Sequence, residues 1–160
     1  VDSIKERRHV TVGVISDTHD RLPSSAISAF RKVDLIVHAG DIGGEQILTS
    51  LKKIAPVIAV CGNMDYGSWS NTLPAATVTR VGGINLYLCH ILDESNAQIQ
   101  DCQVVIYGHT HRPAHHKRNG IVYLNPGSAG DPRHAFPPTV AVLAIDRANI
   151  TAELVTLSDD

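Results

Sequence analysis

The sequence predicts an α/β fold in which two mixed β-sheets pack face to face, with helices on their outer sides. In the first half of the chain, short apolar runs alternate with amphipathic segments, which is typical of parallel strands joined by helical crossovers. In the second half, apolar runs are separated by short turns, two of them rich in glycine, which indicates antiparallel hairpins. One doubly wound sheet does not need so many antiparallel strands, so two sheets are favoured.

The first half contains three predicted strands and two predicted helices. The strands are expected at 10–15, 34–38 and 57–61, which are apolar runs too short for helices. Pro23 suits a first helical turn, and apolar residues at spacing three follow it, so a helix is expected there. An amphipathic stripe over 47–54 indicates the second helix.

The second half contains three predicted hairpins, one further buried strand and one short helix. The hairpin turns are expected at 82–83, 119–120 and 146–149, and the strands of the first and third hairpins at 77–81, 84–89, 139–145 and 150–155. The remaining strand is expected at 104–107 and the short helix at 94–100. No linker or internal repeat divides the chain, so residues 1–160 are expected to form a single domain.

Composition excludes several classes of protein. The chain has 14 Lys and Arg against 16 Asp and Glu, and it is 43% hydrophobic, which excludes a disordered chain. A dedicated nucleic-acid binder is not expected, because phosphate-backbone affinity needs a cationic face. No apolar run approaches the ~20 residues of a membrane span.

Cysteine usage and the first residues of the sequence bear on location. Cys61, Cys89 and Cys102 form no C-x-x-C pair and lie near apolar stretches, so they are interpreted as reduced thiols. The first ten residues contain no apolar signal-peptide core. Both observations favour a cytoplasmic location.

Polar side chains capable of binding metal follow five predicted strands. Because the carboxyl ends of parallel strands share one edge of a sheet, these side chains are expected to meet. In the D-x-H and H-x-H segments, an extended backbone would point alternate side chains the same way. The seven residues are Asp17, His19, Asp41, Asn63, His90, His109 and His111.

The chemistry of this set predicts a pair of metal ions. Carboxylate, imidazole and amide groups without thiolate suit Mn, Fe, Zn, Ni or Co better than a calcium cage or a structural zinc site. Seven ligands exceed what one tetrahedral ion accepts, so two ions sharing a carboxylate are expected. Such a pair, about 3.5 to 4 Å apart, is the usual device for in-line attack on phosphorus.

The ordered motifs resemble those of the calcineurin-like metallophosphoesterases, and more narrowly the small bacterial and archaeal phosphodiesterases of that superfamily. The motifs are D-x-H at 17–19, G-D at 40–41, G-N-x-D at 62–65, His90, G-H-T-H at 108–111, N-P-G-S at 125–128 and P-R at 132–133. The resemblance implies a four-layer α/β/β/α sandwich, in agreement with the two-sheet prediction.

Carried over residue by residue, the resemblance divides the seven ligands between two ions. It places the first ion on Asp17, His19, Asp41 and His111, and the second on Asp41, Asn63, His90 and His109. Asp41 bridges, and Asp41, Asn63 and His109 are taken as the catalytic residues. The implied cofactors are two divalent transition-metal ions, with Mn preferred over Ni, Fe, Zn or Co, and the implied nucleophile is a hydroxide held between them.

The resemblance therefore implies a dinuclear phosphodiesterase that hydrolyses a small-molecule phosphodiester. Family members are often homodimers, but nothing in the sequence marks an interface. Two divalent ions, two aspartates and a hydroxide leave one net positive charge, which a monoanionic diester neutralises. The alternative is a non-catalytic protein-interaction scaffold of the same fold, like the retromer subunit. Ligand completeness favours the enzyme.

Two positions depart from the family pattern. Many members carry a histidine after G-N, where this chain has Met64, and the usual H-G-H is here His90-Ile91-Leu92. A thioether cannot donate a proton to a leaving group.

His38 lies inside an apolar strand and is interpreted as a buried, hydrogen-bonded histidine and not as a ligand.

Overall fold

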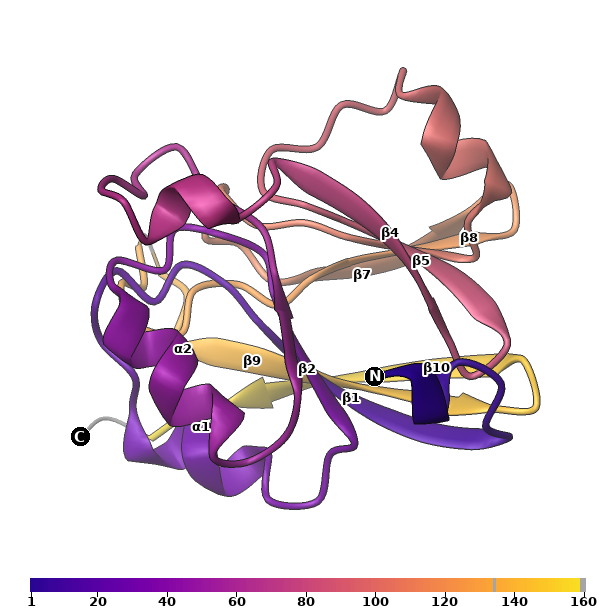
Figure 1. Ribbon diagram of the computed structural model, residues 1–160, viewed down its shortest axis with the longest axis horizontal. Coiled ribbons are helices and arrows are strands. Elements are labelled where there is room, and N and C mark those ends of the chain that lie inside the picture. The colour runs from indigo at the N-terminus through magenta and orange to yellow at the C-terminus, as the bar shows by residue number, and fades with distance from the viewer. Residues whose placement is uncertain (134, 159–160) are drawn as a thin grey trace.

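The computed structural model, which describes residues 1–133 and 135–158, contains two five-stranded mixed sheets that pack face to face (Figure 1). In the first sheet, in the order β10-β9-β1-β2-β3, the last three strands are parallel and β9 and β10 are antiparallel additions. These strands are β1 (His9–Ile15), β2 (Leu35–His38), β3 (Val57–Ala59), β9 (Thr139–Asp146) and β10 (Asn149–Thr156).

The second sheet has the order β4-β5-β6-β8-β7. Its three central strands, β5, β6 and β8, are parallel, and the two edge strands are antiparallel to their neighbours. The strands are β4 (Ala76–Val81), β5 (Ile84–Cys89), β6 (Val104–Ile106), β7 (Ala114–Arg118) and β8 (Ile121–Asn125). The predicted parallel order of the first half and the predicted hairpins of the second half are both confirmed.

Helices cover the two outer faces unequally. The α-helices α1 (Ser24–Ala29) and α2 (Glu45–Lys52) lie on the outer face of the first sheet (Figure 1). The outer face of the second sheet is covered by the 3₁₀ turn η3 (Ala97–Asp101), which contributes Ile99 to a small apolar cluster. The four-layer sandwich is confirmed, but its fourth layer is this short 3₁₀ segment and not the helix expected at 94–100, because the chain is extended at Asn96 and again at Cys102, just before β6. Two further 3₁₀ turns are η1 (Asp2–Ile4) and η2 (Ser70–Thr72).

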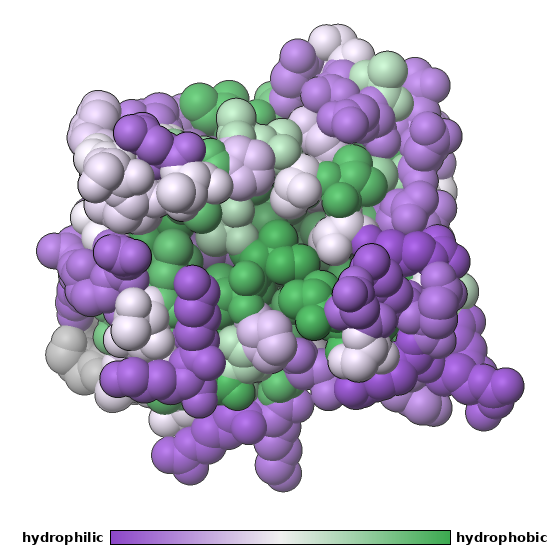
Figure 2. Space-filling view, in the orientation of Figure 1, coloured by the Kyte–Doolittle hydropathy of each residue, from purple (hydrophilic) through white to green (hydrophobic). Residues whose placement is uncertain are grey.

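The main core lies between the two sheets. Along β1, Val12 and Val14 face the second sheet, whereas Ile15 belongs to the cluster under the helices. This alternation follows from the period of two in a strand, which lets one strand serve both cores. In the space-filling view, apolar residues gather in the middle of the face, between the two sheets, and polar residues surround them (Figure 2).

The three cysteines are free thiols. Burial raises the pKa of Cys89 to about 12, so this thiol stays protonated at neutral pH. None of the described helices is long and apolar enough to cross a bilayer.

The carboxylate of Asp34 ties the start of β2 to the first residues of β1. It accepts hydrogen bonds from the Thr11 amide at 2.8 Å and from the Arg7 guanidinium at 2.6 Å. Partial burial disfavours the charged carboxyl, but these two donors outweigh it and lower the pKa of Asp34. Because the folded-state pKa is depressed, this stabilisation is complete above the unfolded-state pKa and is lost as the pH falls through the folded-state pKa.

We therefore expect Asp34→Asn to reduce the free energy of unfolding by about 1 kcal/mol at pH 7, since the partly exposed pair with Arg7 is screened by water. The deficit should shrink below about pH 4, where the carboxyl of the unfolded chain becomes protonated, and further as the pH falls through the lowered folded-state pKa. Urea unfolding at pH 7 and pH 3 checks this, with the exposed Asp101→Asn as a matched charge-removal control. A deficit of the same size at both pH values would contradict it.

Candidate metal centre

Loops at the carboxyl ends of five strands hold the seven predicted ligands, and main-chain hydrogen bonds extend the pairing of neighbouring strands into these loops. The Asp17 amide donates to the Gly40 carbonyl at 3.0 Å, and the His19 amide donates to the Asp41 carbonyl at 3.0 Å. In the second sheet, Gly108 donates to the His90 carbonyl at 3.0 Å. These bonds set the ligand loops side by side.

The backbone at the ligands is left-handed, so the prediction of extended D-x-H and H-x-H segments is wrong. Residues other than glycine adopt positive φ uncommonly, and such strain persists where the surrounding structure holds it, often at functional sites. The loop-to-loop hydrogen bonds provide that restraint here. Five ligands have this conformation: Asp17 (φ 53°), His19 (φ 44°), Asp41 (φ 52°), His109 (φ 71°) and His111 (φ 57°).

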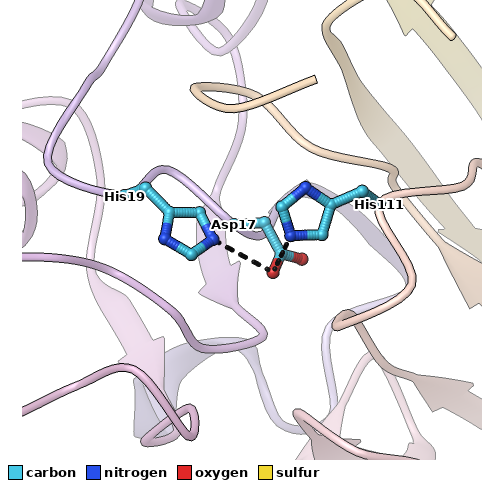
Figure 3. A group of neighbouring side chains, drawn as sticks. All are labelled: Asp17, His19 and His111. Atoms are coloured by element: carbon cyan, nitrogen blue, oxygen red, sulfur yellow. Dashed lines mark ion pairs between the residues drawn. The ribbon is translucent and has the colours of Figure 1, made fainter. Parts of the chain in front are cut away.

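Asp17 lies between the rings of His19 and His111, and the two ion pairs drawn in Figure 3 meet at one of its oxygens. Its Oδ2 accepts hydrogen bonds from the Ser16 hydroxyl at 2.7 Å and the His109 amide at 3.1 Å. Its Oδ1 is buried without a hydrogen bond, 3.2 Å from Nε2 of His111 and 3.7 Å from Nε2 of His19. The protein therefore satisfies one oxygen and leaves the other for a cation.

Asp41 is arranged in the same way and lies between two histidines. Its Oδ1 accepts a hydrogen bond from the Met64 amide at 2.8 Å. Its Oδ2 is 3.3 Å from Nε2 of His90 and 3.6 Å from Nε2 of His19. Oδ2 of Asp41 therefore faces His19 and His90 at once.

Main-chain carbonyls orient two of the imidazoles. Nδ1 of His90 lies 2.7 Å from the Ala39 carbonyl, and Nδ1 of His111 lies 2.6 Å from the Asp131 carbonyl. Because a carbonyl can only accept, each Nδ1 carries a proton, and in the neutral ring the lone pair is on Nε2. The two Nε2 atoms are the ones that face the carboxylates, as in other histidines that bind metals.

Asn63 and His109 form a pair next to His90. Oδ1 of Asn63 and Nδ1 of His109 are 3.1 Å apart, and the rings of His109 and His90 meet edge to face with centroids 5.2 Å apart. Two donor atoms that each lie about 2.1 Å from one ion are about 3 Å apart, so this pair has the spacing of neighbouring ligands.

The charges of the centre are strongly coupled. Burial raises the pKa of the Asp17 carboxyl, although the hydrogen bond from Ser16 opposes this. Burial on its own would raise the pKa of Asp41 as well. The contact with His90 and the hydrogen bond from the Met64 amide outweigh burial, so the pKa of Asp41 is lowered. For His90, burial favours the neutral ring, yet Asp41 and Asp17 outweigh it and raise its pKa. The carboxylates therefore attract positive charge into the centre.

The residues present fit divalent transition-metal ions. Two groups offer donor atoms that all lie within 4.8 Å of one another: Asp17 with His19 and His111, and Asp17 with Asp41 and His90. Oδ1 of Asp17 and Nε2 of His19 and His90 are buried without a hydrogen-bond partner among the described residues. Burial of unpaired polar atoms costs free energy, which a bound cation would remove.

Two glycines allow the carboxylates to lie this close to the backbone. A Cβ on Gly62 would collide with the amide nitrogen and Oδ1 of Asp41. A Cβ on Gly108 would collide with the Ser16 hydroxyl and lie 2.8 Å from Oδ2 of Asp17. No other residue fits at either position without moving a ligand.

Several supporting residues could not be identified as such from the sequence. The buried Asp65 carboxylate accepts from the amides of Ile42 at 2.8 Å, Gly43 at 3.0 Å and Gly62 at 2.8 Å, so it joins the loops that carry Asp41 and Asn63. In the sequence, only the position of Asp65 in the G-N-x-D motif at 62–65 connects it with the site. The main-chain carbonyl of Asp131, which orients His111, cannot be predicted from the sequence, because every residue has such a carbonyl.

The N-P-G-S segment at 125–128 makes hydrogen bonds to two of the ligand loops. The hydroxyl of Ser128 donates to the Asp17 carbonyl at 2.8 Å, and the side-chain amide of Asn125 donates to the Gly108 carbonyl at 3.0 Å. The nearby Arg133 pairs with Asp131 at 3.0 Å. This segment therefore positions ligand loops from both sheets.

His38 is a buried, hydrogen-bonded histidine, as predicted. Its Nδ1 accepts from the Gly40 amide at 3.2 Å. The hydroxyl of Thr18 donates to the Ile42 carbonyl at 2.7 Å, so it accepts from Nε2 of His38 at 3.0 Å. Burial lowers the pKa of His38 to about 3, and the neutral ring is fully used in orienting its neighbours.

Comparison with known proteins places this geometry in a family. Residues 10–148 match the calcineurin-like phosphoesterase superfamily domain. A probable metallophosphoesterase of Methanothermobacter thermautotrophicus is 38% identical over 158 residues, covering 90% of this chain and 91% of the relative.

Two solved structures share the fold. An archaeal phosphodiesterase has a TM-score of 0.77 at 22% identity, with coverage of 91% of this chain and 99% of that one. Vacuolar protein sorting 29 of Cryptosporidium parvum has a TM-score of 0.74 at 20% identity, with coverage of 94% and 99%. The family match and the methanogen relative show that this chain belongs to the calcineurin-like phosphoesterase superfamily.

Proposed function

We propose that this chain is a dinuclear metal-dependent phosphodiesterase that acts on a small-molecule phosphodiester in the cytoplasm. The observation that carries the proposal is the convergence of two carboxylates and three imidazoles, among which Oδ1 of Asp17 and Nε2 of His19 and His90 are buried without a hydrogen-bond partner. The fold likeness to an archaeal phosphodiesterase supports it.

The proposed ligands of the first ion are Asp17, His19, Asp41 and His111, and those of the second are Asp41, Asn63, His90 and His109. The first set rests on the short distances around Oδ1 of Asp17 and Oδ2 of Asp41. The second set rests on the contact of His90 with Asp41 and on the neighbouring Asn63 and His109 pair. Asp41 is the proposed bridge because it faces histidines of both sets.

Two bound divalent ions, with Mn preferred, would supply positive charge for a phosphate ester and lower the pKa of water, which is the chemistry of in-line attack on phosphorus. The chain itself orients the imidazoles through carbonyls and excludes water from Asp17 and Asp41, which are 0% and 3% exposed. Met64 takes no part in proton transfer, so leaving groups that depart well as anions are favoured.

The alternative is a protein-interaction scaffold, and the fold likeness to vacuolar protein sorting 29 gives it weight. All seven candidate ligand positions carry side chains that can coordinate a metal, as hydrolysis requires and protein binding alone does not. Buried carboxylate and imidazole atoms without hydrogen bonds lower stability unless a cation fills the space between them. The enzyme is therefore favoured.

Hydrolysis tests the proposed function directly. Manganese-loaded protein is expected to release 4-nitrophenolate from bis(4-nitrophenyl) phosphate with a higher kcat/KM than from 4-nitrophenyl phosphate, because the single net positive charge of the centre matches a monoanion. Chelation should abolish both reactions, and restored Mn should recover them. Absence of metal-dependent hydrolysis of either ester would refute the enzyme, and preference for the monoester would refute the diester assignment.

Two ligand variants should differ in metal stoichiometry. Asp41→Asn removes the charge that faces both sets of ligands, so it is expected to lower the content of both ions and to reduce kcat/KM by at least ~10³-fold. Asn63→Ala is expected to lower the content of the second ion only. Elemental analysis after reconstitution with Mn, at equal protein concentration, measures both. Two tightly bound ions in Asp41→Asn would rule out the bridge.

A further inference from the structure

A pocket of about 320 Å³ lies beside the candidate metal centre. It is lined by Cys61, Gly62, Asn63, Ala75, His90 and Ile91. Two of these six, Asn63 and His90, are also proposed ligands of the second ion. The pocket and the metal centre therefore share a wall, and a group attached to a phosphorus atom at the centre would lie at the mouth of the pocket.

The other side chains that line the pocket are apolar. Cys61, Ala75 and Ile91 offer a thiol, a methyl and an aliphatic side chain, and none of them carries a formal charge at neutral pH. Ile91 is 55% exposed although it adjoins a ligand histidine. A ligand that covers such an exposed aliphatic side chain removes apolar surface from water, and this makes binding more favourable.

The neighbouring chain extends this apolar character. Met64, the residue after Asn63, is 49% exposed, and Tyr66 is 70% exposed with its hydroxyl 4.0 Å from the sulfur of Met64. Both Met64 and Ile91 directly follow a proposed ligand in the chain. Exposed apolar side chains therefore lie at the two loops that carry Asn63 and His90.

We propose that this pocket binds an apolar ester group of the substrate, so that the substrate class is a phosphodiester with an alkyl or aromatic alcohol on at least one side. The inference rests on the proposed function, because it needs the phosphate at the metal centre. The volume is sufficient, since an apolar cavity of about 150 Å³ already holds benzene. A sugar in the same place would lose water from its hydroxyls and find few hydrogen-bonding partners in return.

Binding of two phosphonates to the manganese-loaded protein tests the pocket, with calorimetry as a readout separate from catalysis. Methylphosphonate and benzylphosphonate present the same charged group, but only the second carries a ring. Burial of apolar carbon strengthens binding by roughly fourfold for each methylene. Benzylphosphonate is therefore expected to bind at least ~10-fold more tightly than methylphosphonate.

Two pocket variants and one control make the test specific. Ile91→Ser removes the apolar edge, and Ala75→Gln places a polar amide in the wall, so both should reduce the benzyl preference at least ~3-fold while leaving methylphosphonate affinity unchanged. Ile27→Ser is the matched control, because Ile27 is also an exposed isoleucine, at 39%, on the distant helix α1. It should leave both affinities unchanged. Since Ala75 is exposed, Ala75→Gln serves alone if Ile91→Ser does not fold.

The outcomes separate this inference from the proposed function. Metal-dependent diester hydrolysis together with equal affinity for the two phosphonates overturns the apolar pocket and leaves the phosphodiesterase intact. A benzyl preference that neither pocket variant lowers also overturns it. Protein that hydrolyses no ester and binds no phosphonate overturns both the proposed function and this inference.

Discussion

Two carboxylates buried where five strand ends meet are the feature on which the rest of this molecule depends. Asp17 and Asp41 each use one oxygen for hydrogen bonds from the protein and turn the other toward histidine nitrogens. Buried charge of one sign is costly unless cations or donors balance it. The left-handed ligand backbone, the glycines against each carboxylate and the carbonyl-oriented histidines all serve to hold these two groups in place.

The position of the site could be predicted because it follows from strand ends. Apolar runs ending in Asp, Asn or His identify the loops, and parallel strands deliver those loops to one edge. The structure brings all seven predicted residues into this region, with Asn63 and His109 paired beside His90. The conformation of the ligand loops could not be predicted in this way. It depends on tertiary hydrogen bonds such as that from Asp17 to Gly40, which no local pattern encodes.

The remaining differences also have tertiary causes. The helix expected at 94–100 is a five-residue 3₁₀ turn, because the chain is extended at Asn96 and again at Cys102, just before β6. Met64 and Ile91, which depart from the family pattern, join the apolar surface around the pocket beside Asn63 and His90. Both residues are therefore apolar at positions where the resemblance to the family led us to expect histidine, which fits the proposed apolar ester group.

The central claim is that the chain holds two ions with Asp41 between them. Anomalous diffraction from crystals of the manganese-loaded protein, recorded on both sides of the Mn absorption edge, tests it most directly. We expect two peaks about 3.5 to 4 Å apart, one beside Asp17, His19 and His111 and one beside Asn63, His90 and His109, with Asp41 contacting both. A single peak at full loading, or two peaks that do not share Asp41, would contradict it.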